Sequence, residues 1–123
     1  MILGIGCDIT DIGRITQSLE KFGDKFLRHI LSPRELSLKH GPLAAFVAGR
    51  FAAKEACAKA FGTGFRQGLT MPQIEIVNDA LGAPKLVFTN FAQELALRKR
   101  VQQSFLSISH EQKFAVAFVV LEG

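Results

Sequence analysis

The chain has 123 residues and a formal net charge of +4, from 15 Lys and Arg against 11 Asp and Glu. This length suits one domain with a hydrophobic core, so we expect a single domain over residues 1–123. Hydrophobic residues make up 48% of the chain and eleven residues are Phe, which excludes an intrinsically disordered protein. The positive charge favours anionic partners: nucleic acid, acidic proteins or phosphorylated cofactors.

No segment has the character of a signal peptide or a membrane span. Residues 1–9 lack a basic start and reach Asp8 too early for a signal peptide, and the longest apolar run, residues 43–61, contains four charged residues. Cys7 and Cys57 lie in apolar runs without a metal-binding spacing, so we expect reduced thiols in the core. These features predict a cytoplasmic protein with no membrane partner.

The chain is expected to begin with a strand over residues 2–9. Its apolar side chains alternate with Gly4, Gly6 and Asp8, which predicts one bare face that ends at a carboxylate. Glycine in a strand often marks the close approach of a backbone or a ligand. The bare face therefore leaves room for something to dock beside Asp8.

A helical period follows from residue 11, with apolar residues every three or four positions as far as Phe26. Gly23 is expected to end or kink this helix, and Asp24 could cap a continuation through residue 31. Ser32-Pro33-Arg34-Glu35 is a capping box with Pro at the first helical position, which predicts the start of another short helix.

The longest expected helix covers residues 43–61, is rich in Ala and ends at Gly62. Its sides are almost all apolar, so we expect it to be buried within the domain or between subunits. Each of its four charged residues then needs a partner. These residues are Arg50, Lys54, Glu55 and Lys59.

The remaining segments predict further strands and one more helix. They comprise a loop over 62–68, a strand over 73–78, a turn over 79–84, a strand over 85–88, a helix over 90–100 capped by Thr89, and strands over 104–109 and 114–121 joined by a turn at 110–113. The fold class is therefore α+β, with an antiparallel sheet packed against the long Ala-rich helix.

Asp8 and Glu55 are the candidate metal ligands. Glu55 shares its helical face with Phe51 and several Ala. An ordinary exposed ion pair with Lys59, one turn later, would contribute only a few tenths of a kcal/mol to the stability of the helix. A carboxylate in such surroundings needs a metal, an ion pair or a bound ligand. Two carboxylates with added waters suit Mg²⁺, which commonly bridges to substrate phosphates, and Lys59 could neutralise a phosphate there.

Several motifs, in order along nearly the whole chain, closely resemble those of the holo-acyl-carrier-protein synthases. They are Gly6-Cys7-Asp8-Ile9, Gly49-Arg50-Phe51-Ala52-Ala53-Lys54-Glu55-Ala56, Lys59-Ala60-Phe61-Gly62-Thr63-Gly64, Gly82-Ala83-Pro84 and Ser107-Ile108-Ser109-His110. The resemblance implies the 4′-phosphopantetheinyl transferase fold, Mg²⁺ on Asp8 and Glu55, and coenzyme A as the donor. It also implies a homotrimer with active sites between subunits.

The reaction that this resemblance implies is attack by a serine of apo-acyl carrier protein on the β-phosphate of coenzyme A. It would yield holo-acyl carrier protein for fatty acid biosynthesis and release adenosine 3′,5′-bisphosphate. Lys59 and Arg50 would hold phosphate oxygens in line for displacement. Glu55 or a water on the metal would accept the serine proton.

The resemblance places further residues at the coenzyme A site. Ser109 and His110 would contact the ligand, with His110 also a candidate catalytic residue, although a histidine in a turn usually has no special role. Gly62 and Gly64 would offer free backbone groups to the phosphates or the pantetheine, in addition to ending the helix. Pro84 would border the same ligand.

Four basic residues form a candidate docking site for the carrier protein. Arg14, Lys21, Lys25 and Arg28 fall on one stripe if the first helix continues through Gly23. Such a stripe is often only a solvated charged face. Because carrier proteins are acidic and the family docks them on this helix, we expect complementary charge to steer them here.

Two other functions fit parts of the sequence. A basic nucleic-acid-binding protein would fit the charge, but the chain lacks a recognition motif and its Phe residues fall mostly on predicted core faces, so no nucleic-acid partner is expected. A non-catalytic trimeric scaffold would keep the fold without the chemistry. The presence of Asp8, Glu55 and Lys59 opposes that second alternative.

Overall fold

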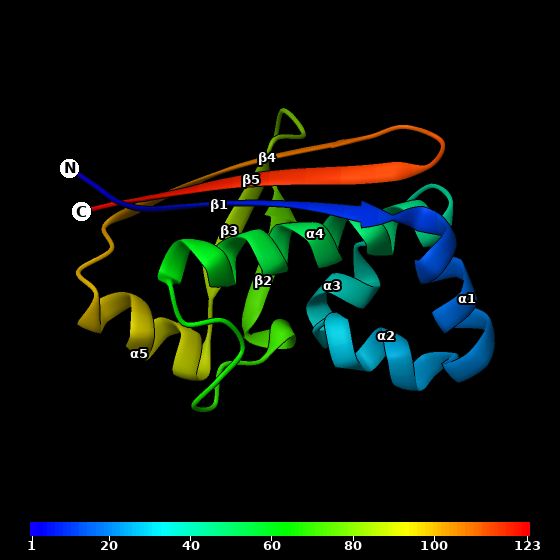
Figure 1. The fold of residues 1–123 in the computed structure, drawn as a ribbon, viewed down its shortest axis with the longest axis horizontal. Helices are drawn as coiled ribbons and strands as arrows, with labels where there is room; N and C mark the ends of the chain where they lie inside the picture. Colours follow the sequence, from blue (N-terminus) through cyan, green and yellow to red (C-terminus); the bar gives the residue numbers. More distant parts are fainter.

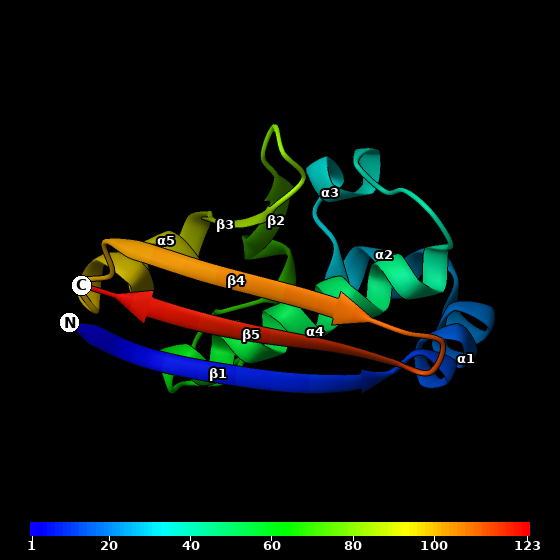
Figure 2. The same ribbon diagram turned by 90° about the horizontal axis from the view of Figure 1, so that it is seen from above.

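The computed structural model describes all residues, 1–123, and combines a three-stranded sheet, a two-stranded ribbon and five α-helices (Figures 1 and 2). In chain order the elements are β1 (Ile2–Asp11), α1 (Ile12–Phe22), α2 (Asp24–Ile30), α3 (Pro33–Ser37), α4 (Leu43–Phe61), the 3₁₀ helix η1 (Met71–Gln73), β2 (Ile74–Asn78), β3 (Pro84–Phe88), α5 (Asn90–Arg98), β4 (Gln103–His110) and β5 (Phe114–Glu122). The expected α+β class with antiparallel pairing is confirmed.

The three-stranded sheet has the order β1-β5-β4, and both pairs are antiparallel. Helix α4 crosses one face of this sheet, and the opposite face is uncovered (Figure 2). The strand side chains that face α4 are mostly small or aliphatic and are buried. On β5 these residues are Ala115, Ala117, Val119 and Leu121.

The bare face of β1 lets the backbone of α4 pack directly against the strand. A Cβ added to Gly4 would lie 2.0 Å from the carbonyl oxygen of Ala60, and one added to Gly6 would lie 1.8 Å from that of Ala56. Both separations are far below van der Waals contact, so only glycine permits this packing. The space that the sequence left open for a docked group is therefore taken by the protein's own helix.

The long helix is buried by its own chain. Thirteen of the 19 residues of α4 are buried, and this helix takes part in both hydrophobic clusters of the core. The shortage of solvent-facing positions that the sequence shows in this helix therefore requires no neighbouring subunit. Exposed apolar surface lies instead on the face of the three-stranded sheet that is opposite α4.

The outer face of the sheet exposes a continuous set of apolar side chains from all three strands. They are Leu3, Ile5 and Ile9 of β1, Phe105 of β4, and Phe114, Val116 and Phe118 of β5, each 38–65% exposed. The expectation that Phe residues lie mostly on core faces is wrong for three of these. Cys7 also lies on this face and is exposed, so its predicted place in the core is wrong, whereas Cys57 is buried.

Local signals account for some of the helix boundaries. The capping box of Ser32 and Glu35 is confirmed at α3, and Gly62 ends α4 in the left-handed conformation with φ 81°. Gly23 separates α1 from α2, and the chain changes direction there (Figure 1). Asp24 is the first residue of α2 and forms no cap, which corrects that prediction. Thr89 occupies the N-cap position of α5 as predicted, but its hydroxyl donates to the carbonyl of Gln73 and makes no hydrogen bond to the helix. No helix is both long and apolar enough to cross a membrane.

The contact between β1 and α4 predicts a large effect of Gly6→Ala. The new methyl group would collide with backbone that cannot rotate away, so α4 must shift from β1. We expect the free energy of unfolding to fall by about 3 kcal/mol, at the upper end for overpacked sites, measured by urea denaturation. Cys7→Ala, which changes the next residue on the outer face, should leave it nearly unchanged. Equal stability of Gly6→Ala and the wild type would contradict this packing.

Candidate active site

Asp8 and Glu55 line one cleft of about 320 Å³ between β1, α1, α2 and α4. Asp8 comes from the glycine-bearing face of β1, and Glu55 lies one turn after Phe51, another lining residue, on α4. Arg14 of α1 completes one wall. The structure therefore brings together the two predicted metal ligands, although they lie 47 positions apart in the sequence.

Both oxygens of Asp8 have partners within the chain. The Thr10 hydroxyl donates to Oδ2 at 3.0 Å, and the Lys59 ammonium lies 3.3 Å from Oδ1 while also donating to the carbonyl of Cys7 at 2.9 Å. Lys59 remains more than half exposed. Its ammonium therefore balances part of the negative charge of the cleft and keeps the freedom to reach a ligand.

Glu55 takes part in none of the four ion pairs in the chain. Partial burial and the nearby negative charge of Asp8 raise the pKa of Glu55 above its ordinary value, and Lys59 only partly opposes them. A cation placed between the two carboxylates would remove this repulsion.

The donor set of the cleft fits Mg²⁺ bound through two carboxylates. The chain contains no cluster of three or more His, Cys, Asp or Glu side chains that could enclose a metal. Mg²⁺ typically takes one or two carboxylates and fills its other positions with water and substrate phosphates. Asp8 and Glu55 would therefore hold such an ion while leaving most of its ligand positions to a phosphorylated substrate.

Arg50 belongs to a second polar group on another face of α4. Its guanidinium donates to Asn78 Oδ1 at 3.0 Å and stacks over the ring of Phe46, with 4.3 Å between Cζ and the ring centroid. Its Nε is the one buried side-chain polar atom without a hydrogen-bond partner. Asn78 and Gly82 line an adjacent hollow that shares no residue with the cleft of Asp8 and Glu55.

The other predicted contacts to coenzyme A are dispersed in the single chain. Pro84 pairs with Asn78 in the β2–β3 ribbon, beside Arg50. His110 ends β4 and lines a separate hollow, and Ser109 points to the outer face of the sheet. Within one chain, therefore, Arg50, Pro84, Ser109 and His110 do not reach the carboxylate cleft.

The glycine loop after α4 stands next to Lys59, but its backbone is not free as predicted. The N–H groups of Gly62 and Gly64 donate to carbonyls of the last turn of α4, at 3.0–3.1 Å and 3.4 Å respectively. Both residues have positive φ and open space where a Cβ would stand. They can therefore approach a ligand closely, but not by offering these N–H groups.

The four predicted docking residues are exposed and take part in no ion pair. They do not form one helical stripe, because Gly23 divides them between two helices that run in different directions (Figure 1). Arg14 and Lys21 lie on α1, and Lys25 and Arg28 lie on α2. Arg14 alone borders the carboxylate cleft.

Sequence reasoning missed three residues that hold charged side chains in place. Thr10, which orients Asp8, lies two positions later on the same strand face, so strand alternation could have revealed it. Asn78, which holds Arg50, lies 28 positions away and has no local signal. The third omission, Glu35 as the partner of Lys54, is equally non-local.

The family model of the 4′-phosphopantetheinyl transferase superfamily matches residues 4–119. This match covers nearly the whole length, so the chain belongs to that superfamily. Two curated relatives named holo-[acyl-carrier-protein] synthase refine the comparison. The one from Hamiltonella defensa is 46% identical over 99% of this chain and 98% of its own, and the one from Halorhodospira halophila is 47% identical over 98% of each.

Solved structures give the same result. The holo-[acyl-carrier-protein] synthase from Neisseria meningitidis superimposes with a TM-score of 0.94 at 40% identity, covering 100% of both chains. The Helicobacter pylori synthase, solved in complex with coenzyme A, gives a TM-score of 0.87 at 36% identity, covering 96% of this chain and 99% of that one. The expected fold is therefore confirmed along the whole chain.

The raised pKa of Glu55 predicts a pH-dependent stability of the metal-free protein. A carboxyl whose pKa is raised by folding binds more protons in the folded than in the unfolded state, so it disfavours folding once pH exceeds its ordinary value of 4.5. Glu55→Gln should therefore raise the melting temperature in EDTA at pH 7.5 relative to the wild type, by more than it does at pH 5. Thermal melts at both pH values would measure this.

The matched control is Glu20→Gln, on the exposed surface of α1. It should change the melting temperature little at either pH. If Glu55→Gln behaves like this control, the two carboxylates do not repel one another as described.

Proposed function

We propose that the chain is a holo-[acyl-carrier-protein] synthase, which transfers the 4′-phosphopantetheine group from coenzyme A to a serine of apo-acyl carrier protein in fatty acid biosynthesis. The observation that carries this proposal is the cleft in which Asp8 and Glu55 meet beside Lys59. Support comes from full-length relatives of that name and from a related structure with coenzyme A bound. The nucleic-acid and scaffold alternatives have no comparable support.

The cleft residues divide the work of phosphoryl transfer. Asp8 and Glu55 would hold Mg²⁺, which when bound polarises the pyrophosphate and offsets charge on the leaving oxygen. Lys59, already beside Asp8, moves its exposed ammonium from that carboxylate to a phosphate oxygen. Thr10 keeps Asp8 oriented meanwhile, because its hydroxyl donates to Oδ2, and Oδ1 becomes free when Lys59 moves.

Glu55 is also the proposed acceptor of the serine proton. It lines the cleft and takes part in none of the ion pairs within the chain, so a carboxylate oxygen that the metal does not hold is free to accept a proton. His110 lies apart from this cleft within one chain, so any catalytic part for it requires a neighbouring subunit.

A homotrimer with active sites between subunits is proposed for two reasons. The outer face of the sheet exposes more apolar side chains than an isolated protein usually leaves in water. The cleft of Asp8 and Glu55 and the group around Arg50 and Pro84 are separate in one chain, and a second copy could bring them together on one coenzyme A molecule. The buried side of Arg50, with its free Nε, suits a phosphate from such a ligand.

The basic surface of α1 and α2 is proposed to receive the acidic carrier protein. Its four cations are exposed and lack acidic partners, and Arg14 reaches the rim of the cleft where the serine must enter. Because the helices diverge at Gly23, the surface is a corner and not a stripe. A cytoplasmic setting is proposed as well, and the two free cysteines fit a reducing compartment.

Transfer itself is tested by mixing the protein with Mg²⁺, coenzyme A and an apo-acyl carrier protein, and by following the mass of the carrier. We expect the mass to rise by one phosphopantetheine group. Asp8→Asn should lower kcat about 10²- to 10³-fold, as expected for a lost stabilising group at a phosphoryl-transfer site. A folded wild-type protein that modifies no carrier would overturn the proposal.

The docking surface predicts a selective effect of charge reversal. The double variant Arg14→Glu, Lys25→Glu should raise KM for the carrier about tenfold, because two favourable surface charges become repulsive. KM for coenzyme A should not change. Lys99→Glu, just after α5 at the other end of the molecule, is the control (Figure 1). An unchanged KM for the carrier would remove α1 and α2 from the docking surface.

The trimer predicts that Phe118→Asp dissociates the assembly. Light scattering coupled to size exclusion should give three times the 13.5 kDa chain mass for the wild type and a lower mass for the variant, because a charge would be buried in an apolar interface. Leu97→Asp, at an exposed leucine on α5, should leave the mass unchanged. A wild-type protein that runs as a monomer would refute the trimer.

A further inference from the structure

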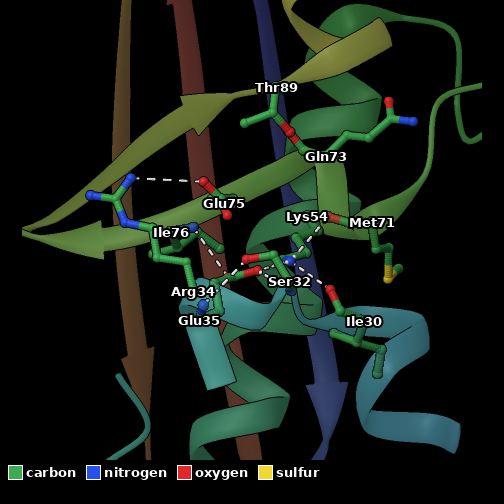
Figure 3. A network of polar contacts seen from close by, with 10 residues as sticks. All are labelled: Ile30, Ser32, Arg34, Glu35, Lys54, Met71, Gln73, Glu75, Ile76 and Thr89. Atoms are coloured by element: carbon green, nitrogen blue, oxygen red, sulfur yellow. Dashed lines mark hydrogen bonds and ion pairs between the residues drawn. The ribbon is translucent and has the colours of Figure 1, made fainter. Parts of the chain in front are cut away.

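A fully buried ion pair joins Lys54 of α4 to Glu35 of α3 (Figure 3). The Lys54 ammonium donates to Glu35 Oε1 and to the carbonyl of Ile30, both at 2.5 Å, and to the carbonyl of Met71 at 3.0 Å. An ammonium has three hydrogens to donate, so these three acceptors satisfy it completely. Lys54 therefore occupies a single, fixed position.

The carboxylate of Glu35 is equally well satisfied. Oε1 also accepts the N–H of Ser32 at 3.0 Å, and Oε2 accepts the N–H of Ile76 at 3.1 Å. The same carboxylate thus closes the capping box of α3 and holds strand β2. The two side chains therefore join five elements at one point: the end of α2, the start of α3, the middle of α4, η1 and β2 (Figure 3).

The position of this pair connects it to both groups of site residues. Lys54 lies one turn after Arg50 and directly before Glu55, so turning α4 about its axis would move all three side chains together. Ile76 lies two residues before Asn78, which holds Arg50. On the opposite side, Ile30 is the last residue of α2, which carries two of the proposed docking cations.

We propose that Glu35 and Lys54 act as positioning residues for phosphopantetheine transfer, by fixing α4 with its metal ligand relative to the β2–β3 ribbon and to α2. This inference rests on the proposed function. Neither side chain touches a substrate, and both act through Glu55 and Arg50. The pair holds α4 from one side, as the contact with Gly4 and Gly6 holds it from the other.

The main alternative is that the pair contributes only to stability. Buried ion pairs are a poor means to that end, because their desolvation offsets the attraction and apolar residues of similar size often stabilise as well or better. Their directional hydrogen bonds do what apolar packing cannot, since they specify one orientation of the helix. A positioning role and a stability role also predict different behaviour of the folded variants.

Two variants separate these roles. Glu35→Asp keeps the charge but withdraws the carboxylate by one methylene, so it cannot reach Lys54 and Ile76 together. Glu35→Gln keeps the size but places an amide N–H₂ or an uncharged oxygen opposite groups that need a carboxylate. Leu95→Ala, in the core on α5 and away from this network, supplies a control with a comparable loss of stability.

The measurements are made at a temperature at which circular dichroism shows each protein to be folded. Calorimetry gives the affinity for Mg²⁺ without any substrate, and the transfer assay gives kcat and both KM values. We expect Glu35→Asp and Glu35→Gln to weaken Mg²⁺ binding about 3- to 10-fold and to lower kcat about tenfold, whereas Leu95→Ala lowers only the melting temperature.

Folded Glu35 variants with wild-type affinity for Mg²⁺ and wild-type kcat would overturn the inference and leave the pair a purely structural one. If Glu35→Gln does not fold, the same decision is made on Glu35→Asp, which retains the charge. The affinity for Mg²⁺ needs no transfer activity. A wild type that binds Mg²⁺ but modifies no carrier would therefore refute the proposed function and still allow the positioning effect to be measured.

Discussion

The direct contact between the backbones of β1 and α4 determines where Asp8, Glu55 and Lys59 of the candidate active site lie. Gly4 faces Ala60 and Gly6 faces Ala56, so two residues of strand run beside four residues of helix. Two strand residues span about 6.7 Å and four helical residues about 6 Å, so the two spacings match over this contact. Glu55 and Lys59 each directly precede a contacting alanine. They are therefore held at the edge of the contact, next to Asp8.

The four charged residues of α4 show how one helix serves both structure and chemistry. Each has a different environment: Lys54 is sealed in an ion pair, Arg50 is stacked on Phe46 and held by Asn78, Lys59 bridges to Asp8, and Glu55 has no partner. Lys54 and Arg50 lie on one face of the helix and Lys59 and Glu55 on the next, so rotation about the helix axis separates the charges of the carboxylate cleft from the other two. A small rotation would consequently disturb both sets, which is why α4 is fixed on two sides.

The sequence predicted features that depend on neighbouring residues and failed where distant segments decide. The capping box at Ser32 and the glycine at Gly62 are local, and the ends of α3 and α4 follow from them. Cys7 was misplaced because an apolar strand face usually points to the core, whereas in β1 the glycine face is the packed one. The need for partners along α4 was clear from its composition. The partner of Lys54 is Glu35, which lies 19 positions away in the sequence, and no local pattern indicates which acidic residue pairs with Lys54.

The small size of the chain explains both why one face of the sheet is uncovered and why the candidate site residues lie in two separate groups. A three-stranded sheet has two faces, and this chain has one long helix, which covers one of them. Covering the second face within the chain would need another layer of helices. Further copies of the same chain can supply that layer by burying Ile5, Phe105 and Phe118. A site completed across such an interface would need no additional sequence, because each copy already carries both the carboxylate cleft and the group around Arg50, and assembly would then be a condition of activity.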